Sequence, residues 1–156
     1  MKNMHKLGIY LNDEPGDKEA LQFAGLIARL VQPEYIHCIS VRGLENTPSS
    51  TVPELEAVRA KAMEVLSPDL TGRIQLQVCE ATGLGEILRT AQDLDLDMIV
   101  VGRHLPHEQL GLGRTFYRLA RKAPCDVLVV PVGAHPHLNR LLVLVDGSEH
   151  SRMALK

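Results

Sequence analysis

The sequence contains few aromatic residues: it has no Trp, three Tyr and two Phe among 156 residues. A chain of this length is expected to form one domain and is long enough to bury a core. That core must therefore be built mainly from aliphatic side chains. Hydrophobic residues make up 45% of the chain and charged residues 23%, which excludes a disordered polyanion or polycation.

Cysteines and long apolar runs are also scarce. Cys38, Cys79 and Cys125 are widely spaced and form no Cys-x-x-Cys pair, so neither a disulfide framework nor a zinc knuckle is indicated. Each lies in or beside an apolar run, which predicts buried thiols in a reducing compartment. No apolar run approaches the roughly 18 residues of a membrane span, and the apolar stretch after Lys6 is too short for a signal peptide. These absences predict a soluble cytoplasmic domain that does not enter a membrane.

An excess of positive charge is missing as well. The formal net charge is −2 and the pI is about 6.4, which gives no support for broad electrostatic binding to nucleic acid. Four cations do gather in one short stretch, at Arg114, Arg118, Arg121 and Lys122. With few aromatics nearby, a solvated helix face explains this cluster better than a nucleic-acid contact. We therefore expect no nucleic-acid partner.

Short apolar runs recur along the chain and predict strands. The run Met98–Val101 has no polar alternation, which is typical of a parallel strand buried on both faces. The stretch Ile74–Val78 alternates apolar and polar residues and predicts an edge strand. The predicted strands are Leu7–Leu11, Tyr35–Val41, Ile74–Val78, Asp97–Gly102 and Val127–Val132.

Between these runs the apolar residues follow helical spacing. Four helices are predicted, beginning near Asp17, Pro53, Leu84 and Phe116 and ending near Gln32, Ser67, Asp93 and Ala123. Asp17 is the predicted N-cap of the first helix. Strict alternation of strand and helix predicts an α/β fold: a Rossmann-like, open five-stranded parallel sheet with helices on both faces.

One strand-to-helix connection is rich in glycine and predicts a ligand site. The chain leaves the strand Asp97–Gly102 and enters a helix through Gly111-Leu112-Gly113-Arg114-Thr115. Ligands of open α/β sheets bind at the carboxyl ends of strands, and helix N-termini there attract phosphate. Gly102, Gly111 and Gly113 therefore form a weak anion site with Arg114, or they serve only as turn glycines.

The end of the chain repeats its beginning. After a linker-like stretch, Leu141–Val145 matches Leu7–Leu11, and at the same offset Asn12 falls on Asp146 and Asp17 on Ser151. We therefore divide the chain into a first domain, residues 1–133, and a segment, residues 134–156, that contains a linker and the truncated start of a second copy. The alternative is a vestigial tail. A lone strand of this kind is expected to be mobile or to pair with another molecule.

Three stretches are typical of one family: the turn Asp146–Ser151 after a strand, the strand Asp97–Gly102, and the run Gly113–Val130 with Ala123-Pro124-Cys125 near its end. On these residues the chain resembles the universal stress protein family over essentially its whole length. The resemblance implies a stress-response protein with a fold like that of the adenine nucleotide alpha hydrolases. It also implies tandem copies, and a homodimer or a pairing of two domains through the last strand, Val127–Val132.

The resemblance further implies where ATP would bind. Many members use an Asp after the first strand and a loop of the form Gly-x2-Gly-x9-Gly-Ser/Thr, because glycines let backbone N–H groups approach phosphate oxygens. The corresponding positions in this chain are Asn12, Val41, Gly102, Gly111, Gly113, Arg114 and Thr115.

This copy departs from the motif at most of these positions. Asn12 replaces the Asp, Leu105 replaces the second glycine, and Arg114 stands where Ser or Thr belongs, with Thr115 one step late. Aligned on Ala123-Pro124-Cys125, Gly113 becomes the last glycine of the motif, so the loop is also two residues short. These departures predict a degenerate site without tight ATP binding; the alternative is that the modified loop still holds ATP or AMP. Asp146-Gly147-Ser148 keeps the family form, so an intact tandem could bind ATP there.

The sequence offers no catalytic or metal site. The pairs His104/His107 and His135/His137 have no Cys or carboxylate at ligand spacing, so we expect no metal. A Ser–His–Asp order and paired carboxylates at a predicted cleft are also missing, which leaves at most slow ATP hydrolysis. The leading hypothesis is therefore an assembly module that acts through dimer or inter-domain packing.

Overall fold

The computed structural model describes residues 4–11, 15–40, 52–66, 68–75, 84–103, 114–143, 145–149 and 152. The elements in chain order are β1 (Lys6–Leu11), α1 (Asp17–Val31), β2 (Tyr35–Ser40), α2 (Val52–Val65), the 3-10 helix η1 (Pro68–Arg73), β3 (Ile74–Gln75), α3 (Leu84–Asp93), β4 (Met98–Arg103), α4 (Arg114–Lys122) and β5 (Asp126–Pro131).

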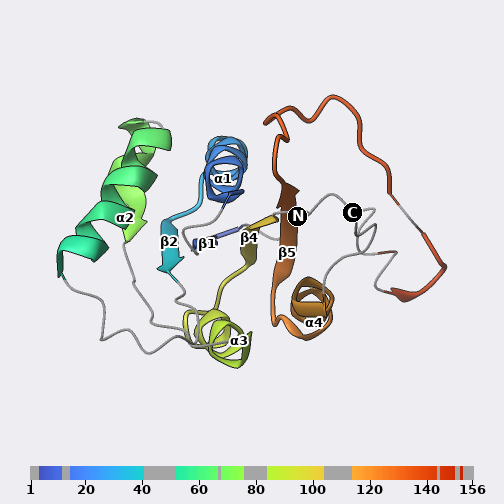
Figure 1. The fold of residues 1–156 in the computed structure, drawn as a ribbon. Coiled ribbons are helices and arrows are strands. Elements are labelled where there is room, and N and C mark those ends of the chain that lie inside the picture. Colours follow the sequence, from blue (N-terminus) through green and yellow to red (C-terminus); the bar gives the residue numbers. More distant parts are fainter. Residues whose placement is uncertain are drawn as a thin grey trace.

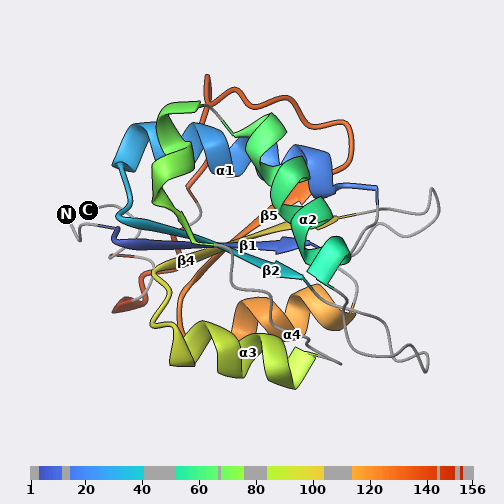
Figure 2. The same cartoon turned by 90° about the vertical axis from the view of Figure 1, so that its left-hand side faces the viewer.

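The strands form one sheet in the order β3-β2-β1-β4-β5, and every pairing is parallel. Helices α1 and α2 cover one face, and α3 and α4 cover the other (Figure 1 and Figure 2). The predicted Rossmann-like architecture is confirmed. Four strands of six residues carry the sheet, while β3 contributes two residues beside β2. The remaining residues of the predicted third strand, 76–78, lie outside the described part of the chain.

The predicted start of the first helix needs a correction. Gly16, not Asp17, is the N-cap of α1, with φ 118 in the left-handed region that favours glycine. Asp17 is the first helical residue, and its buried carboxylate lies 3.8 Å from Lys61 Nζ on α2. The end of α1 follows the prediction: the Gln32 N–H donates to the carbonyl of Ala28, and Pro33 comes next.

The 3-10 helix η1 is absent from the sequence-based prediction, which ended the second helix near Ser67. Its Leu70 is 2% exposed and belongs to the core cluster beneath α1. A 3-10 helix of six residues is too short to produce a hydrophobic period, so its burial is set by packing and not by a local pattern.

The core is aliphatic, as predicted, and lies in two layers, one on each side of the sheet. Leu7, Ile9 and Val100 face α1, whereas Ile99 and Val101 face α3 and α4. This alternation follows from the period of two along a strand.

The two thiols that the structure describes differ in their surroundings. Cys38 on β2 is completely buried in the layer beneath α1, and this burial raises its pKa to about 12. Cys125 is only partly buried, and Cys79 lies outside the described residues. The predicted burial of the thiols is thus confirmed for Cys38, which stays protonated near neutral pH.

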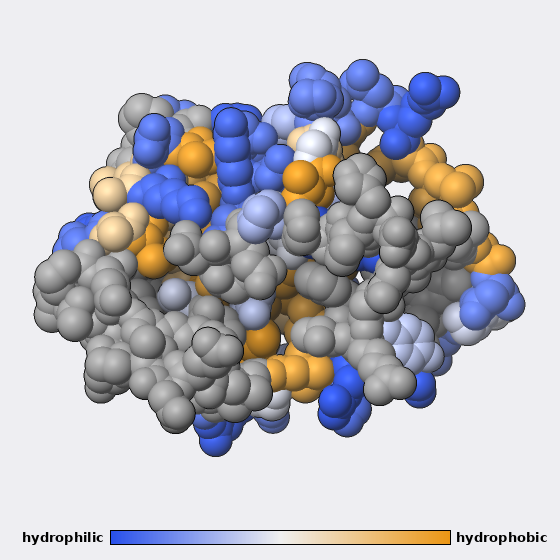
Figure 3. Space-filling model, in the orientation of Figure 1, coloured by the Kyte–Doolittle hydropathy of each residue, from blue (hydrophilic) through white to orange (hydrophobic). Residues whose placement is uncertain are grey.

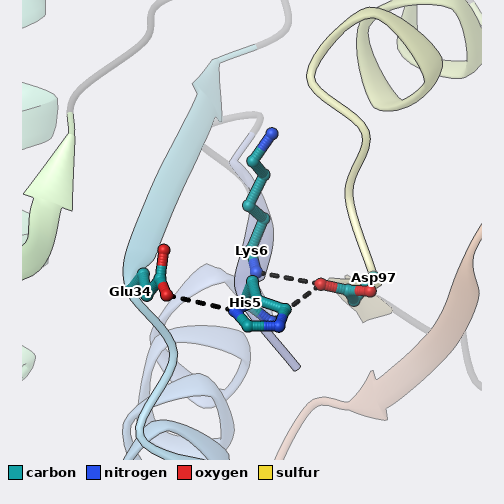
Figure 4. A network of polar contacts seen from close by, with 4 residues as sticks. All are labelled: His5, Lys6, Glu34 and Asp97. Atoms are coloured by element: carbon teal, nitrogen blue, oxygen red, sulfur yellow. Dashed lines mark hydrogen bonds and ion pairs between the residues drawn. The ribbon is translucent and has the colours of Figure 1, made fainter. Parts of the chain in front are cut away.

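A polar network joins the amino ends of β1, β2 and β4 (Figure 4). Asp97 Oδ2 accepts hydrogen bonds from the backbone N–H of His5 at 2.8 Å and of Lys6 at 3.0 Å. The Asp97 N–H in turn donates to the carbonyl of Lys6 at 2.9 Å, and His5 Nδ1 lies 3.2 Å from Glu34 Oε1. Asp97 therefore fixes the start of β1 against the start of β4, at the end of the sheet opposite to the predicted ligand site.

Candidate functional site

The sheet has a switch point between β1 and β4. From β1 the chain builds outward through β2 and β3, then returns to the other side of β1 with β4 and β5. Ligands of open α/β sheets bind outside the carboxyl ends of the strands at such a point. Here those ends carry Leu11, Gly102 and Arg103, and the N-terminus of α1 follows directly after Gly16.

The backbones of Gly16 and Gly102 cross in direct contact at this point. A Cβ atom on Gly102 would overlap the carbonyl oxygen of Gly16 and would lie 3.1 Å from the backbone nitrogen of Asp17. A Cβ on Gly16 would lie 3.2 Å from the nitrogen of Arg103, besides the strain at its positive φ. Close packing therefore explains Gly102, the one glycine that matches the start of the phosphate motif, without any ligand.

The first turn of α1 carries its own negative charge. Asp17 and Glu19 are both in this turn, where the helix dipole favours carboxylates. Lys61 Nζ lies near Asp17 and remains 43% exposed at its side chain. This end of α1 is thus compensated from within the chain, which makes it a poor binding point for an incoming phosphate.

The structure describes only part of the predicted site. Gly102 lies at the switch point, and α4 begins at Arg114 with Thr115 next; the side chains of these two residues are not among those described. Outside the described residues lie Asn12, Val41, Leu105, Gly111, Gly113 and the His104/His107 pair.

Sequence reasoning missed several residues at this edge. Gly16 is not among the predicted site residues, although the Pro15-Gly16 pair before a helix could have indicated a glycine cap. Lys61 and Arg103 gave no signal, because the contacts that bring them to this edge join distant parts of the chain. Among the described residues, no group of three His, Cys, Asp or Glu side chains could hold a metal ion.

The outer edge of β5 pairs with no other strand in the described part of the chain. The N–H of Asp126 donates to Asp97 and that of Val132 to Arg103, so even-numbered residues bond to β4. By the period of two, the backbone N–H groups of Val127 and Val129 point to the open edge. Val127, Leu128 and Val129 are half-buried, with side chains packed on both layers of the core.

Beyond β5 the chain turns beside α1. The N–H of Gly133 donates to Glu19 Oε1 at 3.0 Å, and the N–H of Ala134 donates to the carbonyl of Pro131 at 3.1 Å. The following segment runs past the edge of the sheet (Figure 1) and exposes hydrophobic side chains, some of them visible at the right of Figure 3. Leu141 is 77% and Leu142 87% exposed, and residues 141–143 and 145 pair with no strand.

The outer face of α4 is cationic. Arg118, Arg121 and Lys122 are exposed, and the Arg121 guanidinium lies 5.5 Å from the ring centroid of Tyr117. This arrangement is that of a solvated helix face, in line with the sequence-based interpretation.

Comparisons with known proteins follow the fold. A universal stress protein in complex with cAMP matches with a TM-score of 0.64 and 14% identity, covering 84% of this chain and 99% of that chain. A universal stress protein from Archaeoglobus fulgidus in complex with dAMP matches with a TM-score of 0.56 and 18% identity, covering 83% and 99%. Another from Archaeoglobus fulgidus DSM 4304 has a TM-score of 0.57 and 15% identity, covering 82% of this chain but 44% of that chain. At these identities the likeness establishes the fold.

The chain was also compared with curated proteins and with models of protein families. Among curated proteins, no match to the chain is found. No helix in the described part of the chain is long and apolar enough to cross a membrane. The family model of the universal stress proteins matches residues 4–131. This match spans most of the chain and agrees with the fold, so the chain belongs to the universal stress protein family.

Proposed function

We propose that this chain is an assembly module of the universal stress protein family, and that it acts through the open edge of β5. The observation that carries the proposal is the outer edge of β5: the N–H groups of Val127 and Val129 face away from β4, and no described strand pairs with them there. Such an edge is a template for pairing with another strand. The partner is a second copy of this chain or a second domain of the same protein.

The substitution Val129→Pro tests this edge. Proline removes the outward N–H while leaving the hydrogen bonds to β4 intact, and it is tolerated at edge positions of this kind. Sedimentation equilibrium should show association weakened at least about tenfold, which corresponds to about 1.4 kcal/mol. Asn139→Pro, beyond β5, is the matched control and should associate like the unmodified protein. A folded Val129→Pro protein with unchanged association would refute the role of β5.

A degenerate nucleotide site is the second part of the proposal. Gly102 is explained by its contact with Gly16, and the other motif positions depart from the family form, so the motif retains little that is specific for phosphate. Titration calorimetry should show no saturation by Mg-ATP or AMP below about 1 mM, a binding free energy weaker than about −4 kcal/mol.

Binding of an adenine mononucleotide is the second candidate function. It is favoured by the switch point at the carboxyl ends of β1 and β4, and by solved structures of this fold in complex with cAMP and dAMP. In the same titration, saturable micromolar binding of AMP would select this candidate over a degenerate site. Arg114 would then be the first residue to substitute.

A tandem arrangement is the third part of the proposal, in which residues 134–156 are a linker and the start of a second copy. Its support is that the counterpart of Leu141–Val145 is β1, which lies between β2 and β4, whereas Leu141 and Leu142 are exposed. At the same offset, Lys156 corresponds to Gln22. Appending residues 23–133 after Lys156 should therefore complete a second domain and protect the amides of residues 141–145 from exchange. Unprotected amides in this extended protein would contradict the repeat.

We further propose a cytoplasmic location, because Cys38 keeps a buried free thiol and the sequence has no Cys-x-x-Cys pair. Labelling in intact cells with a thiol reagent that does not cross membranes should leave Cys125 unmodified. Labelling of Cys125 under these conditions would place the protein outside the cell membrane.

A further inference from the structure

The first turn of α1 touches two features of the fold that lie far apart in the sequence. Gly16 contacts Gly102 at the switch point, and Glu19 binds the turn that follows β5. We propose that this turn is a latch that couples the Gly16–Gly102 crossing to the direction in which the chain leaves β5. The inference goes beyond the proposed function, and it requires neither a bound nucleotide nor a dimer.

The crossing side of the latch depends on one oxygen atom. The carbonyl of Gly16 accepts the first hydrogen bond of α1, from the N–H of Ala20 at 2.9 Å. The same oxygen is the atom that a Cβ on Gly102 would overlap. A displacement of the backbone at Gly102 toward α1 therefore pushes the acceptor of this hydrogen bond and loosens the first turn.

The exit side depends on the carboxylate of Glu19, the neighbour of Ala20 in the same turn. Its Oε1 accepts the hydrogen bond from the Gly133 N–H at 3.0 Å. Bonds of a backbone N–H to a carboxylate are about twice as strong as bonds to neutral acceptors. Gly133 has φ 78, and a Cβ there would meet no atom within 4 Å, so the position of Gly133 depends on hydrogen bonds more than on side-chain packing.

A second connection closes the path on the β4 side. The N–H of Val132 donates to the carbonyl of Arg103 at 3.0 Å, and Arg103 directly follows Gly102. The exit from β5 is thus held from α1 through Glu19 and from β4 through Arg103. The two hydrogen-bond acceptors, Glu19 and Arg103, lie on the two segments that cross at Gly16 and Gly102.

The consequence concerns the segment beyond Gly133. This segment carries the exposed side chains of Leu141 and Leu142, so its direction decides where they are presented. An event at the switch point that moves Gly102 changes this direction by releasing Glu19.

Amide exchange followed by NMR tests the latch in both directions, because coupling between two sites is reciprocal. Glu19→Ala should raise the exchange rate of the Gly133 amide roughly tenfold or more, and that of the Ala20 amide several-fold. Glu19→Gln, which keeps a neutral acceptor, should give an intermediate effect. Gly102→Ala, which perturbs the other end, should raise the exchange of both amides.

Two matched controls separate the latch from general loosening. Glu86→Ala removes a carboxylate from the first turn of α3, where its ion-pair partner is Arg89 at 3.4 Å. Gly72→Ala adds a Cβ that meets no atom within 4 Å. Both variants should leave the exchange rates of Gly133 and Ala20 unchanged.

Three results would overturn the inference. These are an unprotected Gly133 amide in the unmodified protein, an unchanged Ala20 amide in Glu19→Ala, and an unchanged Gly133 amide in a folded Gly102→Ala. If Gly102→Ala does not fold, the Glu19 variants decide alone, since they read the same coupling from the exit side. Measurements without nucleotide, at concentrations where the chain is monomeric, keep this outcome separate from the proposed function.

Discussion

Removing the carboxylate of Asp97 should destabilise the fold more than any other change at an exposed or half-buried polar group described above. In Asp97→Ala the backbone N–H groups of His5 and Lys6 lose the acceptor that now lies 2.8 and 3.0 Å away. A hydrogen bond to a charged group contributes about 1.5–3 kcal/mol, and the site is only partly buried. We therefore expect the free energy of unfolding to fall by roughly 2–4 kcal/mol, less than the full sum for two such bonds.

Equilibrium unfolding in urea measures this loss directly. The midpoint should decrease while the slope stays unchanged, because the surface exposed on unfolding remains the same. Asp97→Asn keeps one acceptor oxygen and should lose about half as much. Asp93→Ala is the control: this acid ends α3, where the helix dipole disfavours it, so its removal should be neutral or slightly stabilising. A loss in Asp97→Ala below about 0.5 kcal/mol would refute the reasoning, because it would leave the two bonds without net effect.

Further predictions concern the Gly16–Gly102 crossing, the Cys38 thiol and the exposed segment. Gly102→Ala forces Gly16 to move and should lower the free energy of unfolding by about 1–3 kcal/mol, whereas Gly72→Ala should leave it unchanged. Scanning calorimetry compares the two variants, and equal melting temperatures would contradict the contact between Gly16 and Gly102. Burial raises the pKa of Cys38 from 9.0 to about 12, so its thiol should resist a disulfide reagent at pH 8 until the protein unfolds. Because the unfolded thiol ionises first, this group adds stability that is present below pH 9 and is lost as the pH rises from 9 toward 12, which unfolding midpoints across this range would reveal. Leu142→Asp, at a side chain that is 87% exposed, should change the free energy of unfolding by less than about 0.5 kcal/mol. Leu21→Ala in the core should lower it by about 2–5 kcal/mol. A large effect of Leu142→Asp in urea unfolding would mean that the exposed segment packs on the domain.

The architecture could be predicted from the sequence because its signals are local. The unbroken apolar run of β4 and the spaced apolar residues of α1 each indicate their structure without knowledge of the rest of the chain. What could not be predicted depends on distant contacts. Asp97 binds the backbone of His5, 92 residues away in the sequence. Gly16, the N-cap of α1, contacts the backbone of Gly102, which is also far away in the sequence.

Of the candidate site, the sequence predicts the position of Gly102 at the end of a strand but does not predict what this glycine does there. The end of the strand at Gly102 follows from the apolar run before it, and the structure places this glycine at the switch point. Its physical role is a different matter, because the motif assigns Gly102 to phosphate while the packing assigns it to Gly16. A glycine in a sequence pattern cannot distinguish these two uses, since both require the absence of a side chain.

The position of the polar network at the amino ends of the strands affects where the sequence can accept insertions and deletions. His5, Lys6, Glu34 and Asp97 join three strands at the end of the sheet opposite to the predicted ligand site. Loops at the opposite end can therefore gain or lose residues without weakening these bonds. Shortening the loop motif by two residues can therefore alter ligand binding without loss of the fold. For the same reason, loops from other proteins could be grafted at this end of the sheet.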